Sequence, residues 1–253
     1  MKFRVIRPQI FANIPHVDCF FTEANRDAEV LRKMKQSIPG LNFGLNSTAA
    51  EQEVENNYTT FFNNIGLNSK NLSIARQVHG DNIKIVQKPG VSDQTDGMIT
   101  TKNGLILAIQ VADCAAVLVA DSDPNRAVAG AFHAGWRGAL KGIVPKGIAK
   151  MVQEGGELAS LKVYISPCIS VESFEVGNEV ASEFPSEYCD RVSYEKPHID
   201  LKEYLRSQLI DNGIQDQNIE CSPYCTIRDD RFYSFRRERY KAGRMLGVIR
   251  LTG

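Results

Sequence analysis

Short apolar runs that end at turn residues fill the middle of the chain. Residues 72–80 and 83–90 alternate apolar and polar positions, the pattern of half-buried strands, and they end at His79-Gly80 and at a Pro-Gly turn. Residues 104–114 are almost continuously apolar, which is typical of a strand buried on both faces. Further strands of this kind are predicted over residues 115–125, 126–135 and 161–169.

Helical spacing appears on both sides of this centre. Apolar residues three to four apart predict a helix over residues 51–66. A second helix is predicted over residues 138–156, closed by two glycines and open to a kink at Pro145. The third is an amphipathic helix between Asp200, as N-cap, and Gly213, as C-cap.

Three other segments are less regular. Residues 18–38 begin as an apolar strand and continue with charged, helically spaced positions, and residues 176–188 suggest a helix with Pro185 near its end. Residues 231–251 suggest an aromatic and then an aliphatic strand. Strands and helices alternate irregularly, so we expect a mixed α/β (α+β) fold. No linker is long enough to separate domains, so we expect one domain over residues 1–253.

Composition narrows the class of protein. The 30 basic and 30 acidic residues give a formal net charge of +0, which argues against a nucleic-acid or membrane surface as the main partner. The N-terminus does not resemble a signal peptide, so the expected location is cytoplasmic. We therefore expect the 6 cysteines to be free thiols.

Three residues that can bind metals follow separate strand-like runs: His79, Cys114 and His133. If the strands are neighbours, these side chains converge at one edge of a sheet, where sites in open sheets tend to lie. Taken singly, each histidine is more often a hydrogen-bonded residue near a turn than a ligand, and a lone cysteine is more often core, but three such strand ends together strengthen the metal interpretation. Two imidazoles and one thiolate leave the fourth position of a tetrahedral zinc open, as in catalytic sites.

Residues 131–138, AFHAGWRG, hold the single tryptophan of the chain. Beside His133, the small Ala134 and Gly135 would let the backbone approach a site, and Trp136 would form a wall or a stacking face. Arg137 would offer a fixed fork for an anion. In the alternative, Trp136 is only core and Arg137 pairs with a surface acid.

Seven segments together resemble the motifs of the YfiH-like or laccase-domain family, also called multicopper polyphenol oxidase-like proteins or peptidoglycan editing factors. In order, they are RQVHGDNI, TDGMIT, VADCAAVLVAD, AFHAGWRGALKGI, ISPCISVESFEVGNEV, DLKEYLRSQL and CTIRDDRFYSFRRERYKAGRMLGVI. The resemblance covers about residues 71–251 and implies a YfiH-like fold with central mixed sheets flanked by helices. It departs at Glu23, Ala24 and Asn25, where the family usually has Arg-Gly-Gly.

The resemblance implies one zinc held by His79, Cys114 and His133. Such an ion lowers the pKa of a bound water or polarises a leaving oxygen. Asp96 and Asp113 are candidates to orient a ligand imidazole or to handle a proton. Aspartates that simply form turns at strand ends are the alternative.

The implied chemistry is phosphorolysis of adenosine, inosine or S-methyl-5′-thioadenosine, with adenosine deamination as a companion reaction. The expected partners are therefore a purine nucleoside and phosphate. Arg137, Arg236 and Arg244, with Arg237, would provide an electropositive cradle for the phosphate. The alternative for these arginines is a solvated basic strand face.

Other functions stay open at this point. The chain has 4 histidines, too few for a four-copper oxidase, but a single Cu²⁺ at a His₂Cys site is compatible with the residues, with Met98 the only methionine near these motifs. A cysteine hydrolase or amidase acting on peptidoglycan precursors would use Cys114 as nucleophile and His133 as base. The third alternative is a non-enzymatic partner protein with a vestigial site.

Overall fold

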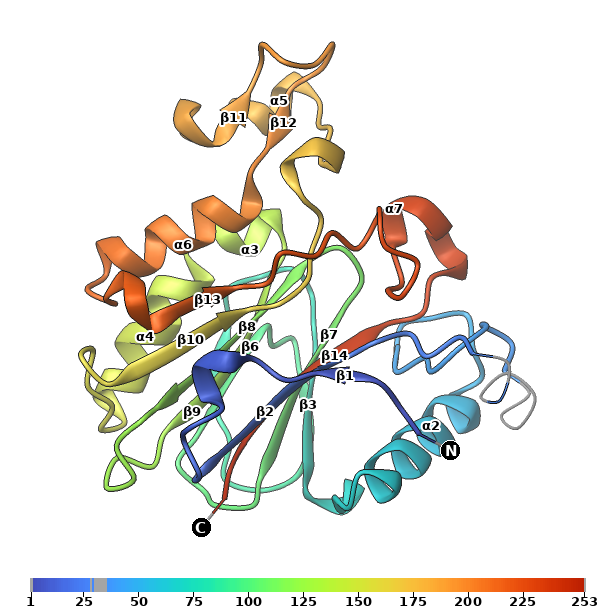
Figure 1. Ribbon diagram of the computed structural model, residues 1–253, viewed down its shortest axis with the longest axis vertical. Coiled ribbons are helices and arrows are strands. Elements are labelled where there is room, and N and C mark those ends of the chain that lie inside the picture. Colours follow the sequence, from blue (N-terminus) through green and yellow to red (C-terminus); the bar gives the residue numbers. More distant parts are fainter. Residues whose placement is uncertain (1, 28, 30–35, 253) are drawn as a thin grey trace.

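The computed structural model describes residues 2–27, 29 and 36–252. Two six-stranded sheets lie face to face, and helices cover both outer faces (Figure 1). The first sheet has the order β1 (Val5–Ile6), β2 (Val17–Thr22), β14 (Met245–Leu251), β7 (Ile106–Val111), β3 (Leu72–Arg76) and β5 (Gly90–Asp93). The second has the order β13 (Ile219–Cys221), β10 (Leu161–Ile165), β8 (Ala115–Asp121), β9 (Ala129–Ala134), β6 (Gly97–Thr100) and β4 (Ile83–Ile85).

The apolar runs are continuous because both faces of the central strands are buried. In β8, Val117 and Val119 face the core under the helices, whereas Ala116 and Leu118 face the core between the sheets. Helices α3 (Trp136–Leu140), α4 (Ile143–Gln153) and α6 (Leu201–Asp211) cover the second sheet, and α2 (Glu51–Asn64) covers the first. This mixed α/β architecture in a single domain is the one expected from the sequence and from the family resemblance.

Both clearest helix predictions are confirmed. The helix predicted over residues 51–66 is α2, and the amphipathic one is α6. The Asp200 carboxylate accepts the N–H of Glu203 at 2.9 Å, as an N-cap should, and Gly213 follows the helix with a positive φ of 91°.

The single helix predicted over residues 138–156 is wrong. The chain breaks at Gly142, whose φ of 76° is left-handed, so α3 and α4 are separate helices. Pro145 lies in the first turn of α4, where the missing N–H costs no intrahelical bond, and therefore causes no kink.

Two other segments also differ from their predictions. In residues 176–188 only α5 (Asn178–Ala181) is α-helical, since Pro185 starts a separate 3₁₀ turn. The predicted aromatic strand is instead α7 (Phe235–Glu238), because the Ser234 side chain caps it by accepting the N–H of Arg237 at 3.1 Å. Most of the helical spacing predicted within residues 18–38 lies outside the described residues.

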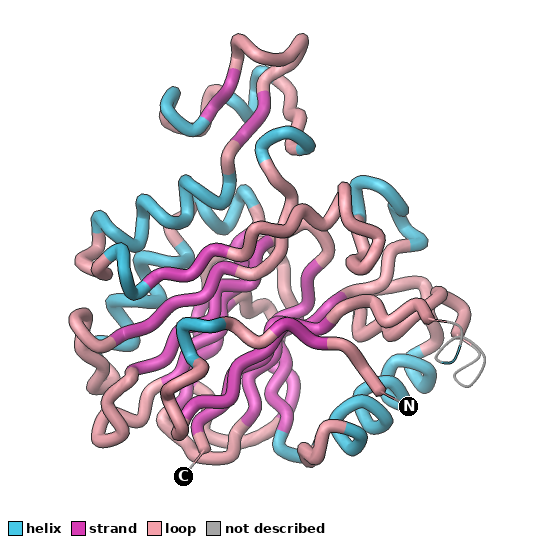
Figure 2. The backbone as a smooth tube through the Cα atoms, in the orientation of Figure 1, coloured by secondary structure: helices cyan, strands magenta, loops and turns pink. Residues whose placement is uncertain are grey.

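A small projection stands above the second sheet and carries the hairpin of β11 (Cys189–Asp190) and β12 (His198–Ile199) (Figure 2). All six cysteines are free thiols, as predicted. Within the described residues, no helix combines the length and the apolar character needed to cross a membrane.

Candidate metal centre and active site

His79, Cys114 and His133 come together where the two sheets meet. Their potential ligand atoms all lie within 4.8 Å of one another. His79 follows β3 of the first sheet, His133 lies in β9 of the second, and Cys114 lies in the short link between β7 and β8. The predicted convergence at the edge of one sheet is therefore wrong in one respect, since the chain crosses from one sheet to the other at Cys114.

Asp96 lies behind this cluster and is fully buried. Its Oδ1 atom is 2.8 Å from Nδ1 of His133, which leaves Nε2 of the same ring as the atom free to bind a metal. The same carboxylate accepts the backbone N–H groups of His79 at 2.9 Å and Gly80 at 2.8 Å. These bonds hold His79 at a left-handed φ of 59°. Asp96 is thus placed to orient both histidines.

Asp113 is placed differently from the expectation that it orients an imidazole. Its carboxylate accepts hydrogen bonds from Thr226 Oγ1 at 2.7 Å, Ser234 Oγ at 3.0 Å and the Arg236 backbone N–H at 2.6 Å. These groups all lie in residues 226–236, the segment that leads into α7 and is called the C-terminal loop below. Asp113 therefore holds this loop, with Arg236, beside Cys114.

The two imidazoles favour a thiolate at Cys114. Burial raises the pKa of the thiol, but the charge and hydrogen bonds of His133 and His79 outweigh burial and bring the pKa down to about 6. Burial correspondingly opposes the charge on His133, yet the Cys114 thiolate and Asp96 raise the His133 pKa to about 9. A thiolate and two imidazoles are a donor set that suits zinc. The carboxylate of Asp96, bonded to the far nitrogen of the His133 ring, is a common companion of zinc-binding histidines.

Gly135 leaves the space that the cluster needs. A Cβ at this position would lie 2.8 Å from Cys114 Sγ and 3.3 Å from Cδ2 of His79. This close packing agrees with the expectation that a small residue at position 135 lets the backbone approach the cluster.

Replacing Gly135 by alanine is expected to weaken metal binding. The added methyl group must push Sγ of Cys114 away from the histidines, and overpacking of this kind costs about 1–3 kcal/mol. Metal titration of G135A by competition with a chromophoric chelator measures the loss. Gly155→Ala is the matched control, because nothing lies within 4 Å of a Cβ there although its φ of 102° also strains the variant. Equal metal affinity in G135A and wild type would contradict the steric argument.

Replacing Asp96 by asparagine is expected to lower metal affinity by about 10–100-fold, the usual effect of losing a carboxylate behind a ligand histidine. Oδ1 of Asp96 accepts the His79 N–H and Oδ2 accepts the Gly80 N–H, whereas an asparagine has one acceptor oxygen, so the loss reports both on the charge beside His133 and on the turn at His79. The same chelator competition measures it. Unchanged affinity in D96N would show that Asp96 only shapes the turn.

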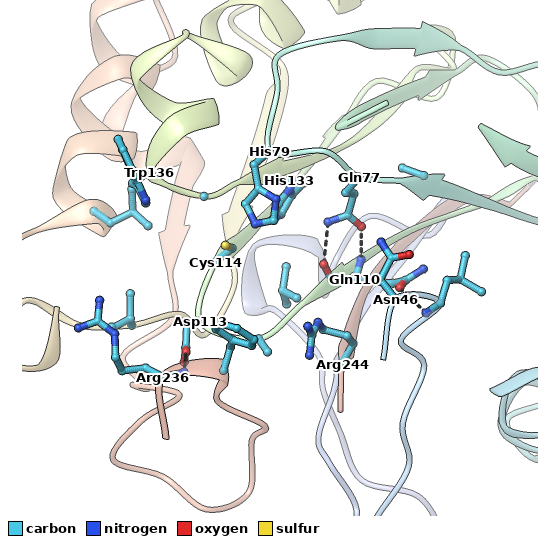
Figure 3. A pocket seen from close by; sticks show the side chains of 18 of the residues that line it. Asn46, Gln77, His79, Gln110, Asp113, Cys114, His133, Trp136, Arg236 and Arg244 are labelled. Carbon is cyan, nitrogen blue, oxygen red and sulfur yellow. Dashed lines mark hydrogen bonds between the residues drawn. The ribbon is translucent and has the colours of Figure 1, made fainter. Parts of the chain in front are cut away.

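The cluster lies in a cavity of about 360 Å³ (Figure 3). Aromatic side chains on its walls are Trp136, Phe174 and Phe235, and uncharged amides are Asn46, Gln77 and Gln110. Of these, sequence reasoning considered only Trp136. Gln110 carried a usable signal, because it is the one polar residue of the otherwise apolar strand β7.

Two of the predicted arginines, Arg236 and Arg244, line this cavity. Arg244 is half-buried, and this burial lowers its pKa. Its Nη1 donates to the backbone oxygens of Ala242 at 2.8 Å and Gly243 at 2.9 Å, and among the described ion pairs none includes Arg244. A half-buried cation that lines a cavity without an acidic partner suits an anionic ligand.

Arg137 does not match its prediction. It is exposed on the first turn of α3, its guanidinium carbon stands 4.0 Å from the centre of the Trp136 ring, and it is not among the described residues that line the cavity. Arg237 instead donates to backbone oxygens of its own loop, including that of Phe232 at 2.6 Å. Arg137 therefore packs on Trp136, and Arg237 stabilises its own loop. Neither is among the described residues that line the cavity.

Residues 23–25, which differ from the Arg-Gly-Gly that is usual in the family, also lie away from this cavity. Glu23 is buried and pairs with Arg4 and Arg231, each at 3.3 Å. Neither Glu23 nor its neighbours Ala24 and Asn25 are among the described residues that line the cavity.

The fold and the cluster together define a two-sheet α/β protein with one His₂Cys centre in a cavity of small-molecule size. The chain belongs to the family described as multi-copper polyphenol oxidoreductase laccase, whose profile matches residues 26–252. Relatives named purine nucleoside phosphorylase are similar to this chain in sequence. The one from Clostridium acetobutylicum is 30% identical over 242 residues, covering 94% of this chain and 98% of the relative. The one from Corynebacterium glutamicum is 32% identical over 206 residues, covering 78% and 81%.

Solved structures share the fold over the whole length. The hypothetical protein YfiH of Bacillus licheniformis is 27% identical with a TM-score of 0.87, covering 99% of both chains. YlmD of Geobacillus stearothermophilus is 25% identical with a TM-score of 0.88, covering 100% of this chain and 98% of that one.

The multi-copper description does not fit the histidines of this chain. His16 is 3.0 Å from the Asp121 oxygen, and His198 is 2.6 Å from the Val171 oxygen, so both are occupied elsewhere. Among residues 2–27, 29 and 36–252, the trio is the one cluster with metal-ligand geometry. Met98 is packed in the core between the sheets.

Proposed function

We propose that this protein is a zinc-dependent purine nucleoside phosphorylase. Its substrates would be adenosine, inosine and S-methyl-5′-thioadenosine, together with phosphate. The observation that carries the proposal is the His₂Cys cluster in one cavity with Arg244, a half-buried cation that has no described acidic partner. The names of the relatives agree with it.

His79, Cys114 and His133 would hold the metal, with Asp96 fixing the His133 ring. Zinc in such a three-ligand site supplies a Lewis acid next to the substrate. We favour zinc over copper because no methionine is among the described residues that line the cavity, and so the usual axial ligand of a blue-copper site is missing.

The remaining cavity residues would bind and orient the two substrates. Arg244 and Arg236 would hold phosphate, and the aromatic walls would contact the flat base. In the reaction a phosphate oxygen forms a bond to the anomeric carbon of the sugar while the bond from that carbon to the purine nitrogen breaks. The pentose 1-phosphate keeps the phosphate, and the base takes the bonding electrons and a proton. Holding both reactants in one small cavity supplies much of the rate enhancement.

Adenosine deamination would be a companion activity of the same cavity, in which water forms a bond to C6 of the adenine ring and the 6-amino group leaves as ammonia. Its products, inosine and ammonia, do not require phosphate. Ammonia release in phosphate-free buffer therefore separates this activity from phosphorolysis.

A second candidate is a cysteine hydrolase or amidase, and the low pKa of Cys114, about 6, favours it. A nucleophilic thiolate needs one imidazole as base, whereas here two imidazoles face the sulfur and a buried carboxylate orients one of them. That second imidazole is the reason for preferring the metal.

The test is to incubate metal-analysed protein with inosine, with and without phosphate, and to separate the products by chromatography. The proposal expects hypoxanthine and ribose 1-phosphate only when phosphate is present. Turnover of amide substrates by metal-free protein, abolished by iodoacetamide, would instead establish the cysteine hydrolase. Zinc-loaded protein that binds no nucleoside and forms no product would reject the phosphorylase.

A further inference from the structure

Gln110 is a polar residue in the middle of a buried strand. Its neighbours Ile109 and Val111 pack in the core between the sheets, and Gln110 itself is only 8% exposed. Because side chains alternate along a strand, Gln110 shares the opposite face of β7 with Ile106 and Ala108. It also lines the cavity that contains the metal cluster. A buried amide in such a position needs partners for both its oxygen and its nitrogen.

The oxygen has its partner. Oε1 of Gln110 accepts the backbone N–H of Leu45 at 3.0 Å. Because a backbone N–H can only donate, this bond fixes which end of the amide faces Leu45. The nitrogen Nε2 is buried and has no hydrogen-bond partner among the described residues.

Gln77, the neighbouring amide of the same cavity, has a partner at both its nitrogen and its oxygen. Its Nε2 donates to the Gln110 backbone oxygen at 2.8 Å, and its Oε1 accepts the Gln110 backbone N–H at 2.8 Å (Figure 3). Gln77 therefore holds the backbone of Gln110 in place. Of these two side-chain nitrogens, Gln110 Nε2 is the one that has no partner among the described residues.

We propose that Gln110 determines specificity for the base, with Nε2 donating a hydrogen bond to a ring nitrogen or carbonyl oxygen of the purine. This inference rests on the proposed function, because it assumes that the cavity binds a purine nucleoside. A donor held by Leu45 on one side and by Gln77 through its backbone is already oriented before the substrate arrives. A base without the matching acceptor leaves this donor unpaired, and such mismatches are rejected more strongly than small changes in shape.

The test compares dissociation constants of the zinc-loaded protein, measured by calorimetry without phosphate. The ligands are inosine and three analogues that each lack one acceptor: 3-deazainosine, 7-deazainosine and purine riboside, which lacks the 6-oxo group. The main variant is Gln110→Glu, which keeps an oxygen for the Leu45 N–H but removes the donor. Gln110→Leu is the second variant, and the control is Arg137→Gln, at an exposed residue that is not among the described residues lining the cavity.

Wild-type protein is expected to bind one analogue at least ~10-fold more weakly than inosine, the effect of one lost hydrogen bond in a buried site. In Q110E and Q110L this gap should shrink below ~3-fold, whereas R137Q, outside the cavity, should keep it. A gap that survives in both Gln110 variants, or three analogues that bind wild type as tightly as inosine, would overturn the assignment.

The same measurement separates the two proposals. If inosine binds with a Gln110-dependent gap but phosphate yields no ribose 1-phosphate, Gln110 is supported and the phosphorylase is rejected. If phosphorolysis proceeds and the gap is insensitive to Gln110, only the specificity assignment fails. No binding of inosine to the zinc-loaded protein would reject both.

Discussion

Replacing Cys114 by serine is expected to remove stoichiometric zinc and to lower kcat/KM for inosine phosphorolysis by at least ~1,000-fold, since the ion supplies several kcal/mol of transition-state stabilisation. The serine hydroxyl has nearly the same size as the thiol, so the cavity should keep its shape. It does not ionise near neutral pH, however, and cannot replace the thiolate that the two histidines favour at this position. Metal analysis and product chromatography on the same preparation measure both effects.

Cys221→Ser is the matched control for this variant. Cys221 is a free, partly buried thiol in β13, at the far edge of the second sheet, and is not among the described residues that line the cavity. It should keep zinc and activity. If C114S kept phosphorolysis while losing zinc, the metal would not take part in the reaction.

Replacing Arg244 by glutamine is expected to reduce kcat/KM for phosphate by ~10²–10³-fold, the range seen when one donor to a developing or bound anion is removed. Arg244 is a half-buried cation in the cavity that lacks a described acidic partner, so no protein group would replace its charge. The Kd for inosine measured without phosphate should change much less. Initial rates at varied phosphate and saturating inosine give the comparison.

Arg137→Gln is the control, because Arg137 is exposed and stacks on Trp136 outside the cavity. It should leave the KM for phosphate nearly unchanged. A larger effect of R137Q than of R244Q would show that phosphate approaches over α3 and would contradict the assignment of Arg244.

Sequence reasoning identified most of the strands and the two best-patterned helices. Continuous apolar runs predicted β7, β8 and β9 because these strands are buried on both faces. The predictions from hydrophobic spacing were wrong where a single residue interrupts or caps a helix. The left-handed Gly142 divides the helix predicted over residues 138–156, and the Ser234 cap turns an aromatic run into α7.

The metal trio was predictable because each member follows or ends an apolar run. The positions of the two sheets and of the polar groups around the trio were not predictable. Periodicity does not show that β7 and β8 lie in different sheets, and so it placed the trio at one edge. Asp96 and Asp113 look alike in sequence, yet one bonds His133 and the other holds the C-terminal loop. The side-chain amide of Gln77 reaches the backbone of Gln110 only because β3 and β7 are parallel neighbours.

The most direct test of the zinc phosphorylase is to strip the protein with a chelator and to titrate zinc back while measuring hypoxanthine release from inosine and phosphate. We expect activity to rise in proportion to bound zinc and to level off at one ion per chain, with no release when phosphate is left out. Full phosphorolysis by the stripped protein, or none by protein that holds one zinc at His79, Cys114 and His133, would contradict the account.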